Sequence, residues 1–137
     1  MPHLTSIETA GRIEELYGAA LADLEAHTQG QPPGMLSALL GMHQDLAFAE
    51  RSITFHRDRL AQLVHPERQF GTHEVSHIFD CVRRLAEAVA VRETQSATTQ
   101  AVLQSLGRAV APKPSTDSAT AALPVPPVPT ASTVATR

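Results

Sequence analysis

Hydrophobic residues recur in alternating steps of four and three along the middle of the chain, which places them on one face of an α-helix. Every seventh residue from Leu39 to Leu60 is apolar, as in a coiled coil or a tight helical bundle. Pro66 disfavours helical geometry at the residue before it, so the pattern predicts a helix over about 35–64. We call eight positions on its apolar face the seam and expect them to bind another helix: Leu39, Met42, Leu46, Ala49, Ile53, His56, Leu60 and Leu63.

The N-terminal stretch carries a second helical signal. Thr5 and Glu8 have the spacing of a capping box, in which each side chain accepts a hydrogen bond from a free backbone N–H of the first turn. Apolar residues then recur at steps of three and four until Gly30 and two prolines, residue types that end helices. The pattern predicts one helix over about 6–28.

A third helix is predicted after Thr72, a residue type that caps helix N-termini. Polar residues occupy its apolar face at positions 92, 96 and 99, before Leu103 resumes the pattern. Either one helix runs from 73 to about 109, which we expect, or it breaks near residue 95 and a short fourth helix folds back. The first half of its buried face is expected to consist of Val75, Ile78, Val82, Leu85 and Val89.

The links between these helices are short, about five to seven residues, so successive helices are expected to lie antiparallel. No segment alternates in the manner of a β-strand. The expected fold is all-α, either an antiparallel three-helix bundle or a long helical hairpin with the N-terminal helix packed on it, formed by residues 1–110. Six of the ten prolines lie in 112–129, so we expect residues 111–137 to form a disordered tail.

Composition narrows the class of protein. The 137 residues suit one domain, and 11 Lys and Arg against 14 Asp and Glu give a net charge of −3, which argues against a nucleic-acid partner. The single Cys81 excludes an internal disulfide, and the sequence shows neither a signal peptide nor a membrane-spanning run of apolar residues. We therefore expect a cytoplasmic protein without a membrane partner. The preference for Arg over Lys is typical of a GC-rich bacterial genome.

The candidate for metal chemistry is an H-E-x-x-H pattern at residues 73–77, on the predicted third helix. Two His four residues apart share one helix face and can bind one zinc ion, and the Glu between them can act as general base. These five residues resemble the motif of the zincin metallopeptidases. The resemblance implies that His73 and His77 are zinc ligands and that Glu74 activates a zinc-bound water.

Other features of this motif favour a solvated surface without metal. A catalytic zinc needs a third protein ligand, and Glu87 would lie ~15 Å beyond His77 on the same helix. No spacing rule supports His65 or Glu67 in that role. Glu74 is also placed to complement the positive end of a helix dipole. We therefore expect no cofactor, with zinc at this motif as the alternative.

The predicted function is that of a small non-enzymatic interaction or structural protein. An unbroken apolar face on a long helix is a surface that a second copy or a partner helix would cover, so we expect self-association through the seam, as a homodimer. A zinc-dependent hydrolase centred on residues 73–77 is the alternative. A third hypothesis, a nucleic-acid accessory protein using Arg83, Arg84 and Arg92, is disfavoured by the acidic charge balance.

Overall fold

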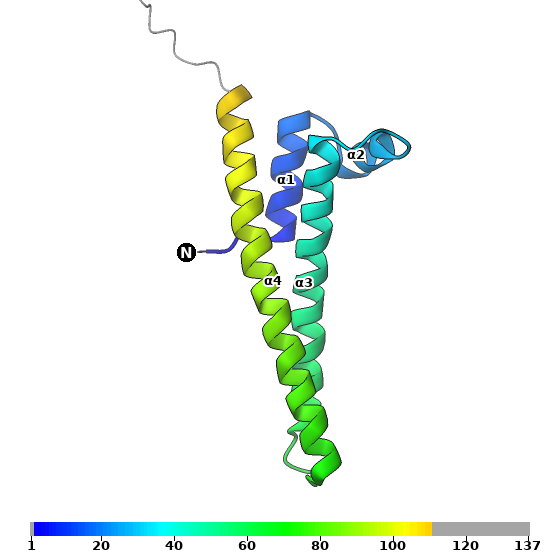
Figure 1. Cartoon of the computed structure of the whole chain (residues 1–137), viewed down its shortest axis with the longest axis vertical. Helices are drawn as coiled ribbons and strands as arrows, with labels where there is room; N and C mark the ends of the chain where they lie inside the picture. Colours follow the sequence, from blue (N-terminus) through cyan, green and yellow to red (C-terminus); the bar gives the residue numbers. More distant parts are fainter. Residues whose placement is uncertain (1, 111–137) are drawn as a thin grey trace, which may run out of the picture.

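The computed structural model describes residues 2–110, which form a small all-helical protein. Two long antiparallel helices, α3 and α4, make a hairpin; α1 lies beside its upper half, and α2 lies across its top end (Figure 1). The expected all-α fold, a long hairpin with packed N-terminal segment, is confirmed, while the tail predicted for residues 111–137 lies outside the described residues. The helices are α1 (Ser6–Tyr17), α2 (Leu21–Thr28), α3 (Met35–Leu63) and α4 (Thr72–Val110).

The prediction of one N-terminal helix was wrong, because the chain turns at Gly18. This glycine adopts φ 68° and ψ 26°, a left-handed conformation that side chains with a Cβ disfavour, and its N–H donates to the carbonyl of Glu14 at 2.7 Å. A second helix then begins at Leu21, so α1 is only 12 residues long. The capping box at Thr5 and Glu8 is confirmed, with both reciprocal hydrogen bonds present.

The predicted middle helix is confirmed as α3, and its seam lies within the chain's own core. Leu39 and Leu46 are fully buried, and Ala49, Ile53 and Leu63 are nearly so, on the side of α3 that contacts α4. Met42, His56 and Leu60 are half-buried. These eight positions therefore stabilise the hairpin, and a role for them in binding a second chain stays a prediction.

The third helix is continuous as expected, and Ser96, Thr99 and Leu103 are buried on its predicted face, but in its first half the buried face is shifted. Val75 and Val82 are 41% and 44% exposed, which corrects their assignment to the buried face, while Cys81 and Ala88 are buried. Small side chains let two helix axes approach closely, so they occupy the contact line and push larger neighbours to its edge. The Cys81 thiol donates to the carbonyl of His56 across this contact at 3.2 Å.

The upper half of the hairpin is a three-helix bundle, with α1 in the groove between α3 and α4. Its apolar core includes Ile13 and Leu39, both fully buried, and it also encloses Thr9 and Thr99. The polar stretch of α4 is thus accommodated because small side chains face the incoming helix α1. The remaining core residues there are Leu4, Leu24, Leu40 and Leu103.

A carboxylate from α3 binds the N-terminus of α1. Glu50 accepts hydrogen bonds from the backbone N–H of Ser6, at 2.8 Å, and from the hydroxyl of the same residue. Since the first N–H groups of a helix have no partner in the helix, Glu50 satisfies one of them and places negative charge at the positive end of the helix dipole. This contact fixes where along the hairpin α1 begins.

Candidate functional site

The H-E-x-x-H residues lie in the first turns of α4, at the tip of the hairpin, which we define as the end that the link 64–71 closes. His73 and His77 are both exposed, and their Nε2 atoms are 2.9 Å apart. Their ring planes are nearly perpendicular, at 88°. The expected sharing of one helix face by the two imidazoles is therefore present.

Glu74 caps the helix in this structure. Its Oε2 accepts a hydrogen bond from the backbone N–H of Gly71 at 2.9 Å, so Gly71 takes the N-cap position expected for Thr72. Hydrogen bonds from its own backbone N–H and from that of Gly71 lower the pKa of the Glu74 carboxyl. A carboxylate held in this way would have to leave Gly71 before it could act as base on a metal-bound water.

The part of the chain that the structure describes brings no third ligand to the two histidines. It contains no group of three or more His, Cys, Asp or Glu side chains placed to hold a metal ion. His56 of α3 lines the same pocket of about 190 Å³ as His77, together with Asp80 and Cys81. The arrangement therefore places two imidazoles at the tip, without the third protein ligand that a catalytic zinc needs.

The arginine pair considered for nucleic-acid binding is engaged by one carboxylate. Arg83 donates to Asp80 at 2.6 Å and Arg84 donates to its other oxygen at 2.9 Å. These hydrogen bonds lower the pKa of the Asp80 carboxyl, and that of the Arg83 guanidinium is raised in turn. Because Glu87 lies 4.0 Å from Arg83 as well, the local charge is close to balanced.

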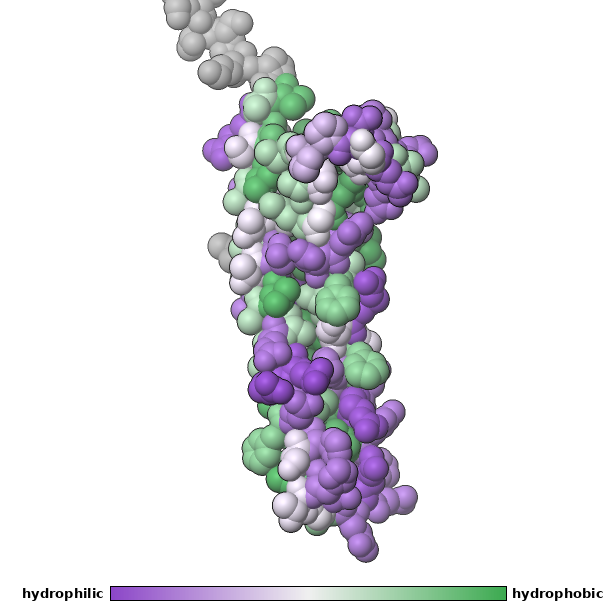
Figure 2. Space-filling model, turned by 45° about the vertical axis from the view of Figure 1, so that its right-hand side comes forward, coloured by the Kyte–Doolittle hydropathy of each residue, from purple (hydrophilic) through white to green (hydrophobic). Residues whose placement is uncertain are grey.

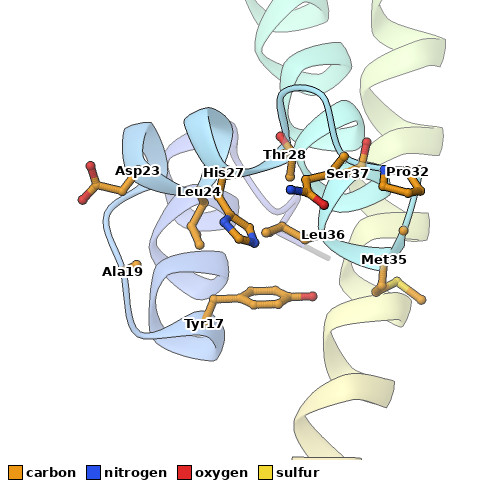
Figure 3. Close-up of a pocket in the computed structure, with 12 residues that line it drawn as sticks. Tyr17, Ala19, Asp23, Leu24, His27, Thr28, Pro32, Met35, Leu36 and Ser37 are labelled. Atoms are coloured by element: carbon orange, nitrogen blue, oxygen red, sulfur yellow. The ribbon is translucent and has the colours of Figure 1, made fainter.

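A pocket of about 620 Å³ opens at the other end of the hairpin, between α1, α2 and α3. The Tyr17 ring extends along one side of this pocket, the His27 ring points toward it from α2, and Asp23 points away (Figure 3). Met35 is 50% exposed and lines the opening with Leu36. Its lining combines an imidazole and a phenol with apolar groups but presents no paired nucleophile and base.

The lower half of the hairpin exposes several apolar side chains on the side where α1 sits higher up. On α3, the face toward α1 carries Glu50; on α4, it carries Glu93, 4.0 Å from His3. Residues three or four positions apart lie on the same face of a helix. The positions that follow Glu50 on α3, and those that precede Glu93 on α4, therefore continue this face toward the tip when taken at these intervals. They reach a set of half-buried or exposed apolar residues that we call the tip strip: Leu60 and Val64 of α3, with Val75, Ile78, Val82, Leu85 and Val89 of α4.

Exposed aromatic side chains lie on both long helices. Phe48 and Phe55 are 66% and 65% exposed on α3, beside pockets that Arg84 also lines, and Phe79 is 71% exposed on α4. In the lower half of the face that Figure 2 shows, hydrophobic patches lie between hydrophilic ones. On the side of the tip strip, steps of three and four from Glu50 and Glu93 toward the tip meet one charged residue, Arg57.

Sequence reasoning missed the tip strip because it assigned Val75 and Val82 to the interior. The signal that could have revealed it is length: an N-terminal helix that ends at Gly18 is too short to cover a partner as long as α3.

Comparison with known proteins adds no homologue, because no family model, curated protein or solved structure matches the chain. No helix within residues 2–110 is both long and apolar enough to cross a membrane.

Proposed function

We propose that the chain is a non-enzymatic helical interaction module that pairs with a second copy of itself through the tip strip. The observation that carries this proposal is the half-covered hairpin: among residues 2–110, three helices pack in its upper half, and α3 and α4 alone pack in its lower half (Figure 1). Toward the tip, beyond the N-terminus of α1, apolar side chains such as Val75 and Val82 remain exposed. An exposed apolar face on two packed helices can accept a further helix.

A second copy suits this apolar surface in symmetry and charge. A two-fold axis through the tip strip would bring two hairpin ends together antiparallel, so that each strip covers the other as in a four-helix bundle. The strip presents no acidic side chain, and its one basic residue, Arg57, lies at the edge. Pairing would therefore bury apolar side chains without bringing like charges together at the centre of the interface.

The size of the strip sets the expected affinity. From Val75 to Val89 it spans about 21 Å of α4 at 1.5 Å per residue, and two packed helices are about 20 Å wide. Each copy would then bury about 400 Å², or about 800 Å² in total, which is below the size typical of stable complexes. We expect a reversible dimer with a dissociation constant on the order of 10 to 100 μM.

Analytical ultracentrifugation of the full chain between about 1 and about 300 μM tests this proposal. The sedimentation coefficient should rise with concentration from that of a monomer to that of a dimer. The variant Val82→Glu places a charge in the strip and should remain monomeric. Its matched control is Val91→Glu, on the opposite side of the same helix beside Phe48, because Val82 and Val91 are both 44% exposed.

Two results would contradict the proposal. A chain that stays monomeric across the whole range does not pair with itself, and the strip would then belong to a partner helix. Equal dimerisation of Val82→Glu and the wild type would place the interface elsewhere. Circular dichroism of both variants checks that the helices are retained.

The zinc-hydrolase alternative rests on the paired imidazoles of His73 and His77. It requires a third ligand from outside the described residues and release of Glu74 from its cap. Peptidase activity that depends on added zinc and is lost in Glu74→Gln would favour this alternative over the interaction module.

A further inference from the structure

We propose that His73 and His77 together bind one divalent transition-metal ion of tetragonal preference, Ni²⁺ or Cu²⁺, at the tip of the hairpin. The observation is the hydrogen bond between the two Nε2 atoms, 2.9 Å apart on an exposed helix face, whose shared proton a metal ion would replace. This site is independent of the tip strip and requires no catalytic step. Its ligands are the two imidazoles, and water completes the coordination.

The distance between the nitrogen atoms indicates the class of metal. With metal–nitrogen bonds of about 2.05 Å, atoms that are 2.9 Å apart subtend an angle of about 90° at the ion. This is the angle between neighbouring ligands in square-planar and octahedral complexes, which Cu²⁺ and Ni²⁺ form. Tetrahedral zinc, with an angle of about 109°, would need the two nitrogens about 3.3 Å apart. An ion that replaces the shared proton while the two nitrogens keep this spacing therefore has the ligand angle of the tetragonal ions.

The helix holds the pair in place before a metal arrives. Both ligands project from one rigid element, four residues apart, so binding immobilises only side chains. The first turn of a helix is an unfavourable place for a cation because of the helix dipole. Here the Glu74 carboxylate, which accepts a hydrogen bond from the backbone N–H of Gly71 at 2.9 Å, supplies a negative charge in the same turn.

Isothermal titration of the tag-free full chain with NiCl₂ tests the site. We expect one Ni²⁺ per chain, and binding at least tenfold weaker in His77→Ala and in His73→Ala. The matched control is His65→Ala, which removes an exposed imidazole from the neighbouring link. Titration with ZnCl₂ should give weaker binding than NiCl₂, because the ligand angle suits Ni²⁺ better.

A second readout is thermal unfolding followed by circular dichroism at 222 nm. Saturating Ni²⁺ should raise the midpoint of the wild type and of Val82→Glu, since metal that binds only the folded helix stabilises it. The two His→Ala variants should show no shift. Absence of binding at millimolar Ni²⁺, or unchanged binding in both variants, would overturn the proposal. Tighter binding of zinc than of nickel would overturn the assigned class of metal.

Discussion

The contact between Glu50 and Ser6 offers a sharp test of how α1 is held on the hairpin. Glu50→Ala removes the carboxylate that accepts hydrogen bonds from the backbone N–H of Ser6, at 2.8 Å, and from the Ser6 hydroxyl. Ser6 is buried, so its N–H would lose its partner away from bulk water. The variant should therefore weaken the docking of α1 more than it weakens the hairpin itself.

The magnitude follows from the kind of contact. A hydrogen bond to a charged group contributes about 1.5–3 kcal/mol, and loss of a helix cap costs about 0.5–2 kcal/mol. Because Glu50 is only half-buried, water partly replaces what is lost, and we expect destabilisation of about 2 kcal/mol for the two bonds together. For a domain of this size this corresponds to a fall in the thermal midpoint of about 8–16 °C.

Urea unfolding by circular dichroism measures the change, with Asp58→Ala as the control. Asp58 is an exposed acidic residue on the same helix, so this variant removes one negative charge without touching α1. Hydrogen exchange should become faster in α1 of Glu50→Ala than in α4. A double-mutant cycle with Ser6→Ala isolates the side-chain part of the pair. If Glu50→Ala and Asp58→Ala lose the same stability, within about 0.5 kcal/mol, Glu50 does not anchor α1.

Substitution by alanine should change the stability in opposite directions at Gly11, within α1, and at Gly18, which follows it. Neither glycine has a neighbouring atom within 4 Å of an added Cβ, so no clash opposes the change. Gly11→Ala should raise the stability by about 1 kcal/mol through helix propensity, whereas Gly18→Ala should lower it by about 1 kcal/mol because of the φ of 68°. Chemical unfolding of both variants checks this, and changes of the same sign would contradict it. Hydrogen bonds lower the pKa values of the Asp80 and Glu74 carboxyls from 3.8 and 4.5. The stability that these carboxylates contribute is therefore present above pH 3.8 and 4.5, and it is lost as the pH falls through the lower pKa values of the folded protein. NMR titration should give midpoints below 3.8 and 4.5 for these two carboxyls, and ordinary midpoints would refute the contacts.

The hairpin was predictable because its pattern is long and regular. The repeat from Leu39 to Leu60 predicts both the extent of α3 and its buried face, since each position reinforces the same period. The break at Gly18 was missed because its neighbours suit a helix. Tyr17 and Leu21, four residues apart, fit the apolar spacing across it, and only the left-handed backbone at the glycine interrupts the helix.

The candidate sites were less predictable because they depend on how the helices are aligned. Hydrophobicity alone assigned Val82 to the buried face of α4, whereas close packing of the helices favours Cys81 and Ala88 there. The approach of Glu50 to Ser6 joins residues 44 positions apart and follows only from where α1 docks. Spacing identified residues 73–77 as a candidate metal site, but it could not show that Glu74 caps α4 by accepting a hydrogen bond from the backbone N–H of Gly71.

The tip and the C-terminal end of α4 lie at opposite ends of one rigid rod (Figure 1). If two copies pair antiparallel at their tips, the stretch from Val82 to Val110 projects outward from each side of the joint. At 1.5 Å per residue each arm is about 42 Å long, so the two Val110 positions stand about 80 Å apart. Such a dimer would act as a molecular spacer, because it would hold whatever is attached at its two ends at this distance. Dissociation at the tips would let the two attached parts move apart.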